Sequence, residues 1–147
     1  MVDVQTEIVI NKPLHLVYEY AVNPDNAPDW YVNIKSAEWV TPKPLIIGSK
    51  IAFKATFLGR QLSYVYEIKE LAPQQKLVMQ TADGPFPMET TYEWEVIDNN
   101  TTSMKLRNKG KPSGFSKLFA PFMKMMMRKA NEKDLKKIKQ IIEGQYA

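Results

Sequence analysis

The side chains best suited to chemistry in this sequence are aromatic groups with polar tips. Tyr64 and Tyr66, and likewise Tyr92 and Trp94, occupy alternate positions of two segments, so each pair projects from one face of an extended strand. Such tips need hydrogen-bond partners when buried, whereas a dry core is built more simply from Leu, Ile and Val. Tyrosine, with an unperturbed pKa of about 10, is a poor base but a fair hydrogen-bond donor. These residues therefore indicate a wall suited to a hydrophobic ligand with one or two oxygen atoms.

Several other chemistries are excluded by composition. The sequence contains no cysteine and one histidine, His15. It therefore has no disulfide scaffold, no cysteine-ligated zinc, no thiol nucleophile, no histidine metal cluster and no serine–histidine triad. His15 falls in the opening turn of a short predicted helix, where a solvated histidine is expected. We predict no catalytic residue, no metal site and no cofactor.

Length and composition are those of a soluble globular protein. The 147 residues are 44% hydrophobic and 24% charged, which predicts one domain spanning residues 1–147. The opening residues alternate polar and apolar side chains and include Asp3 and Glu7, unlike a signal peptide. No apolar run approaches the length of a membrane span. We therefore expect a cytoplasmic protein.

The hydrophobic pattern predicts mainly strands before residue 108. Alternation in Val2–Ile10 predicts a half-buried strand, and Pro13 and Pro24 begin two short helices, the second ending near Trp30. Turn signals then recur every 8–14 residues or so, which favours consecutive antiparallel hairpins. The six further strands are expected at residues 34–40, 50–58, 62–71, 76–81, 88–97 and 101–107.

A long helix is predicted from Gly114 to Gly144. Its first half, to about Met127, is rich in Phe and Met, whereas its second half carries ordinary aliphatic residues. Asp134, with Asn131 beside it, interrupts one apolar stripe of this helix. Two interpretations stay open for Asp134: an edge carboxylate paired with a nearby Lys or Arg, or a polar anchor inside a cavity.

The predicted order is one strand, two short helices, six strands and a long helix that covers the curved seven-stranded antiparallel sheet. This order resembles the START-like, helix-grip (SRPBCC) superfamily, and its polyketide cyclase/dehydrase and lipid-transport branch in particular. The segments that carry the resemblance are INKPLHLVYEYAVNPDNAPDW (10–30), GSKIAFKATFLGRQLSYVYEIKELAP (48–73), GPFPMETTYEWEV (84–96) and EKDLKKIKQIIE (132–143). It implies an α+β fold in which the sheet grips the C-terminal helix around an apolar cavity.

Alternation and helical spacing supply candidate residues for the cavity wall. The predicted ligand-binding residues come from the second short helix, four strands and the methionine-rich half of the long helix. They are Trp30, Phe53, Tyr64, Tyr66, Tyr92, Trp94, Met104, Leu118, Phe119, Phe122, Met123 and Met126. For any one of them, a plain core position is the alternative.

Three functions follow as hypotheses. The first is binding of a small hydrophobic molecule (a lipid, an isoprenoid or quinone, or a polyketide-like compound) by a carrier or sensor. The second is a cyclase or dehydrase acting in the same cavity. The third is an interaction or membrane-surface module that uses the basic long helix, since residues 101–147 carry 12 Lys and Arg against 3 Asp and Glu.

The third hypothesis is the least favoured. A membrane-surface helix needs a free apolar side, which the sheet is expected to occupy. No motif or interleaving of basic and aromatic residues indicates nucleic acid. The lysines are best interpreted as a solvated face, and the protein is expected to be a monomer or homodimer.

Overall fold

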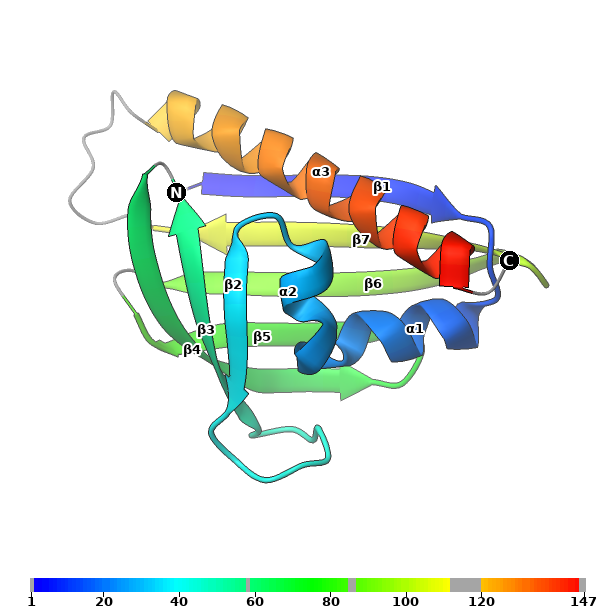
Figure 1. The fold of residues 1–147 in the computed structure, drawn as a ribbon, viewed down its shortest axis with the longest axis horizontal. Coiled ribbons are helices and arrows are strands. Elements are labelled where there is room, and N and C mark those ends of the chain that lie inside the picture. The colour runs from blue at the N-terminus through cyan, green and yellow to red at the C-terminus, as the bar shows by residue number, and fades with distance from the viewer. Residues whose placement is uncertain (1, 58, 85–86, 112–119, 146–147) are drawn as a thin grey trace.

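The computed structural model describes residues 2–57, 59–84, 87–111 and 120–145, which form a curved antiparallel sheet with helices on its concave side (Figure 1). The strands are β1 (Val2–Ile10), β2 (Ile34–Trp39), β3 (Lys50–Phe57), β4 (Arg60–Ala72), β5 (Lys76–Asp83), β6 (Met88–Asp98) and β7 (Thr101–Gly110). The helices are α1 (Leu14–Val22), the short 3-10 helix η1 (Pro24–Asn26), α2 (Ala27–Trp30) and α3 (Ala120–Gln145).

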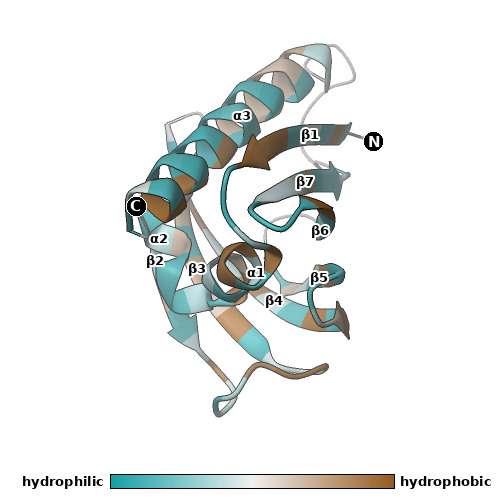
Figure 2. Cartoon of the chain, turned by 90° about the vertical axis from the view of Figure 1, so that its right-hand side faces the viewer, coloured by the Kyte–Doolittle hydropathy of each residue, from teal (hydrophilic) through white to brown (hydrophobic). Residues whose placement is uncertain are grey.

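The sheet has seven strands in the order β1-β7-β6-β5-β4-β3-β2, and every neighbouring pair is antiparallel. The strands from β2 to β7 follow one another as a meander, and β1 joins beyond β7. Figure 2 shows the sheet curling, with α3 along one side and much of the visible face of α3 hydrophilic. The predicted α+β fold is confirmed.

Element boundaries differ modestly from those predicted. Strands β5 and β7 continue to Asp83 and Gly110, past the predicted ends at residues 81 and 107. The second short helix is divided into η1 and α2, and the Asn23 side chain caps the first by accepting a hydrogen bond from the Asp25 backbone N–H at 3.0 Å. Leu118 and Phe119 lie outside the described residues.

Helix α3 packs with its two halves in different surroundings. In the second half, Leu135, Ile138 and Ile142 are at most 1% exposed and belong to the main core. In the first half, Met123 and Met127 join a separate cluster with Val2 and Val4 of β1. The division of the helix into a methionine half and an aliphatic half is therefore also a division of its packing partners.

The last turns of α3 are tied to the junction of β1 and α1. The Lys139 Nζ donates to the Val9 carbonyl oxygen at 2.7 Å and to Glu143 Oε2 at 2.6 Å. The same carboxylate oxygen accepts the Asn11 backbone N–H at 2.8 Å. These contacts fix the position of α3 at the end farthest from its methionine residues.

Replacing Ile138 with Ala should show how much this packing matters. Ile138 is fully buried, so Ile138→Ala removes apolar contacts and leaves a cavity, and we expect unfolding free energy to fall by about 3 kcal/mol. The matched control is Ile47→Ala in the β2–β3 connection, where the side chain is 63% exposed and a change within about 0.5 kcal/mol is expected. Urea denaturation measures both, and equal effects would contradict the assignment of Ile138 to the core.

Candidate ligand cavity

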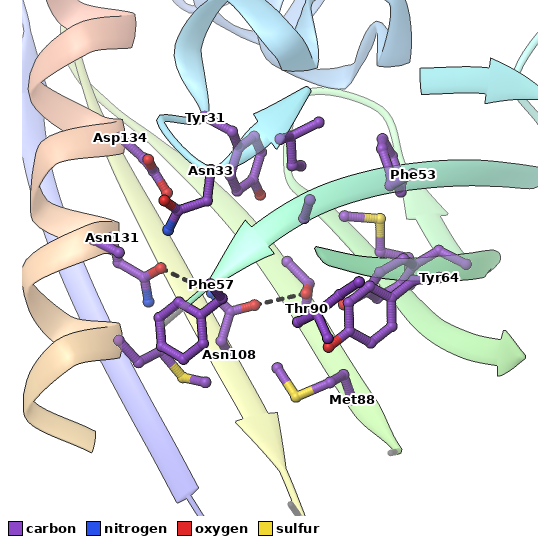
Figure 3. A pocket seen from close by; sticks show the side chains of 17 residues that line it. Tyr31, Asn33, Phe53, Phe57, Tyr64, Met88, Thr90, Asn108, Asn131 and Asp134 are labelled. Carbon is purple, nitrogen blue, oxygen red and sulfur yellow. Dashed lines mark hydrogen bonds between the residues drawn. The ribbon is translucent and has the colours of Figure 1, made fainter. Parts of the chain in front are cut away.

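A cavity of about 130 Å³ lies between the curled sheet and α3. Its wall comes from the inward faces of the strands, from the α2–β2 connection and from one face of α3, as Figure 3 shows from close by. The lining residues are Tyr31, Asn33, Ile34, Phe53, Ala55, Phe57, Leu62, Tyr64, Tyr66, Met79, Met88, Thr90, Asn108, Met127, Ala130, Asn131 and Asp134. Its volume is comparable to that of engineered apolar cavities that bind benzene.

Two alanines leave the space open. Ala55 lies on β3 between the larger inward residues Phe53 and Phe57, at a two-residue period. On α3, Ala130 lies between Met127 and Asp134 on the face that lines the cavity, at helical spacing. Larger side chains at these positions would extend into the cavity, so the sequence itself keeps this part of the interior hollow.

A chain of hydrogen-bonded polar side chains crosses one part of the wall. Thr90 and Asn108 are directly opposed on β6 and β7, and the Thr90 hydroxyl donates to Asn108 Oδ1 at 2.6 Å. The Asn108 Nδ2 donates to Asn131 Oδ1 on α3 at 3.2 Å (Figure 3). The chain therefore links the sheet to the helix at the wall of the cavity, and all three residues are at least 92% buried.

The Nδ2 of Asn131 is buried and has no hydrogen-bond partner among the described residues. Asn131 is 4% exposed and lines the cavity. A buried amide donor without a partner carries a desolvation penalty. This donor is thus an unsatisfied polar group in a residue of the cavity wall.

Asp134 lies one turn farther along α3 and also lines the cavity. Its Oδ1 accepts the Val32 backbone N–H at 2.8 Å, and the residue is 3% exposed. Burial raises the pKa of the Asp134 carboxyl to about 7, although the Val32 hydrogen bond and the charge of Lys137 act in the opposite direction. This burial does not fit an edge carboxylate at the surface. It fits the alternative interpretation, a polar anchor inside a cavity.

The tyrosine hydroxyls are buried as neutral groups. Tyr31 and Tyr92 are hydrogen-bonded to each other through their hydroxyl oxygens. Burial raises the pKa of both residues, and the charge of nearby Asp134 raises them further. Burial also raises the pKa of Tyr64, and that of Tyr66 to about 12. At neutral pH these side chains are hydrogen-bonding groups and not proton acceptors.

The structure brings three of the predicted residues to the cavity wall: Phe53, Tyr64 and Tyr66. Tyr92 lies behind the wall and reaches it through its bond to Tyr31. Trp30 is fully buried and packs beside these two rings, with centroids 4.1 Å from Tyr31 and 5.7 Å from Tyr92, so it supports the wall from behind and does not line the cavity.

Other predicted residues lie away from the cavity. Trp94 and Met104 face each other on β6 and β7, and Trp94 packs edge-on against Tyr18 of α1 at 5.1 Å. On α3, Met123 is buried against β1, Met126 is half-buried, and Phe122 is 45% exposed. Because Phe122 is about 100° around the helix from Met123, the two cannot both face the sheet.

The polar end of the cavity includes residues that were not among the predicted ligand-binding residues, although the sequence had suggested Asp134 as a possible anchor. Thr90 and Asn108 follow the alternation of their strands, two positions from Tyr92 and Leu106 respectively, so the inward pattern carried a signal for both. Asn131 and Asp134 were visible as polar breaks in the helical stripe. Tyr31 and Asn33 lie in a short connection, where no periodic signal was available.

The curled sheet, the long helix and the hollow between them define a class of α+β proteins with an internal cavity. Residues 1–143 match the family model described as polyketide cyclase/dehydrase and lipid transport. The chain belongs to this family, as its resemblance predicted. Comparison with curated proteins found no match.

Solved structures share the fold at low sequence identity. The protein TTHA0849 from Thermus thermophilus is 17% identical, with a TM-score of 0.84 and 99% of each chain covered. The Zhui aromatase/cyclase from a Streptomyces species is 12% identical, with a TM-score of 0.83. The match covers 99% of this chain and 95% of that chain. A START superfamily protein from Mycobacterium smegmatis is 12% identical, with a TM-score of 0.82 and 97% and 98% coverage.

Asp134 should make the stability of the protein depend on pH. Its pKa is about 7 in the folded state, against about 4 in an unfolded chain, so the folded state holds the extra proton between these values. The burial of ionised Asp134 therefore does not destabilise the fold below pH 4, and it destabilises the fold fully above pH 7. We expect unfolding free energy to fall by on the order of 2–4 kcal/mol between pH 5 and pH 8, and this fall to be lost in Asp134→Asn.

Urea denaturation across this pH range measures the effect. Four other carboxyl groups have pKa values lowered by hydrogen bonds and nearby charges: Asp3, Asp25, Glu67 and Glu143. Their ionised forms stabilise the folded state, and this stabilisation is lost as the pH falls, opposite to the trend expected from Asp134. A pH dependence that persists unchanged in Asp134→Asn would show that the carboxyl is not buried in solution.

Proposed function

We propose that this protein binds a small hydrophobic molecule with one or two oxygen atoms in the cavity between the sheet and α3, as a carrier or sensor. The observation that carries the proposal is the asymmetric lining. Most of the wall is aromatic or aliphatic, while a few polar groups from β6, β7 and α3 converge on one part of it. Binding sites for small molecules commonly combine an apolar lining with a few placed polar groups.

The size of the cavity bears on the ligand. A volume of about 130 Å³ accommodates a single ring or a short chain. A larger lipid, isoprenoid or polyketide would have to displace part of the lining. Met88 and Met127 are flexible thioethers suited to such an adjustment.

A cyclase or dehydrase is the second candidate function, and Asp134 favours it. General acid–base catalysis is most efficient when the pKa of the catalytic group lies near the working pH. The carboxyl of Asp134 has a pKa of about 7 and lines the cavity. The family description includes both cyclases and lipid transport, so it supports either function.

The third hypothesis, a module that acts through the basic helix, has less support. None of the described helices is long and apolar enough to cross a membrane. The side of α3 that carries Leu135, Ile138 and Ile142 is buried against the rest of the molecule. A helix that binds at a membrane surface needs such a side to be free.

Filling the cavity tests the binding proposal. Ala55→Leu adds a branched side chain to the cavity wall, and we expect it to weaken the binding of toluene at least tenfold, because the space is occupied. The matched control is Ala52→Leu, on the same strand but on the opposite face, which should bind toluene like the unaltered protein. Amide chemical shifts measured during a toluene titration give the affinities. Equal binding by the two variants would place the ligand elsewhere.

Asp134 separates the carrier from the enzyme. If the protein is a cyclase that uses this carboxyl, Asp134→Asn should abolish formation of an aromatic product from a short linear poly-β-ketone while leaving its binding within about threefold. Ultraviolet absorbance follows the product, and the Asp29→Asn variant, at the exposed surface of α2, is the control. Turnover that survives Asp134→Asn would remove Asp134 from catalysis, and no turnover in the unaltered protein would favour the carrier.

A further inference from the structure

The direction of the hydrogen-bond chain determines which group of Asn131 is left without a partner. The 2.6 Å distance from Thr90 Oγ1 to Asn108 Oδ1 is typical of an O–H···O bond and short for N–H···O. The Asn108 amide therefore turns its oxygen to Thr90 and its Nδ2 to Asn131 Oδ1. The oxygen of Asn131 is engaged in this way, and its Nδ2 has no partner among the described residues.

The electrostatics of the wall add a second constraint. No Lys, Arg or His is among the described residues that line the cavity, and Asp134 is the one carboxylic acid among them. An anionic ligand group placed here would lose its hydration without gaining a cationic partner, and would lie near the Asp134 carboxyl. Phosphate and carboxylate groups are therefore poorly matched to this part of the cavity.

A neutral oxygen acceptor fits both constraints. A ketone oxygen accepts a hydrogen bond without bringing a proton that needs an acceptor of its own, so it matches a single free N–H. Tyr64, Tyr66 and Phe53 on the facing strands supply the apolar surface for the rest of such a molecule.

We propose that the cavity selects neutral, carbonyl-bearing hydrophobic molecules, anchored by a hydrogen bond from the Asn131 Nδ2 to the carbonyl oxygen, and discriminates against carboxylate- and phosphate-bearing lipids. This inference rests on the proposed function of ligand binding and specifies the ligand class. Asn131 is the specificity-determining residue, and Asp134 contributes by disfavouring anions.

Three probes of similar size test the selection in the unaltered protein. Acetophenone carries the carbonyl, ethylbenzene lacks it, and benzoate is anionic at pH 8. We expect acetophenone to bind about fivefold to tenfold more tightly than ethylbenzene, as one buried hydrogen bond allows, and benzoate to bind more weakly than either. Chemical-shift titration gives the affinities, and acetophenone should also shift the side-chain amide signal of Asn131.

Variants of Asn131 identify the donor. Asn131→Asp keeps an oxygen for the Asn108 Nδ2 but removes the free N–H, and Asn131→Leu removes it without adding charge. In both variants, acetophenone and ethylbenzene should bind with about equal affinity. Asn99→Asp, in the exposed β6–β7 turn, is the charge-matched control and should keep the preference.

The outcomes separate this inference from the proposed function. Ethylbenzene binding as tightly as acetophenone in the unaltered protein, or benzoate binding as tightly as acetophenone, would overturn the selection while leaving ligand binding intact. A preference that survives in Asn131→Leu would overturn the role of Asn131. Failure of all three probes to bind would overturn the proposed function together with the inference. The probe comparison needs no variant, so it stands even if an Asn131 variant does not fold.

Discussion

Burial of α3 against the curled sheet is the interaction on which the rest of the structure depends. Ile138 and Ile142 are fully buried, and each such side chain contributes about 1.5–3 kcal/mol relative to an exposed position. The same helix holds Asn131 and Asp134, one turn apart. Aliphatic packing near the end of the helix therefore fixes polar groups in its middle at defined distances from β6 and β7, even though the burial of those groups is itself costly.

The polar groups of the interior are gathered and not scattered. Thr90, Asn108 and Asn131 form one chain, and Tyr31 and Tyr92 form a pair close enough to Asp134 to be affected by its charge. Gathering them lets most satisfy one another, which offsets the cost of burying each. It also gives the cavity a polar part and an apolar part.

The sequence predicted the fold well because the signals for it are periodic. Alternation identified every strand, and the inward residues Phe53, Tyr64, Tyr66, Tyr92, Trp94 and Met104 are all buried. Alternation says which face a residue occupies but not how far along the strand the cavity extends. Trp94 and Met104 thus share a face with the cavity wall yet lie in the core, with Trp94 against α1, because a second element covers that end of the sheet.

The wall of the cavity was predicted less well than the fold, for a related reason. A cavity is defined by small residues such as Ala55 and Ala130, and by residues of irregular connections such as Tyr31, none of which stands out in a hydrophobic pattern. In the methionine half of α3, Phe122 and Met126 were selected because Phe and Met residues are so frequent there. Helical geometry instead turns Met127 and Ala130 to the cavity. The helical stripe that Asp134 interrupts was the better guide, since it follows the angle between residues.

The pairing of β1 with β7 has a consequence for how the protein is made. Thr6 lies opposite Leu106 across this pair, and α3 packs on β1 from still later in the chain. Contacts so distant in sequence carry a large loop-closure cost and form slowly. During synthesis, β1 therefore leaves the ribosome long before either neighbour exists. The hollow interior closes only when α3 has emerged, so the cavity is among the last features of the molecule to form.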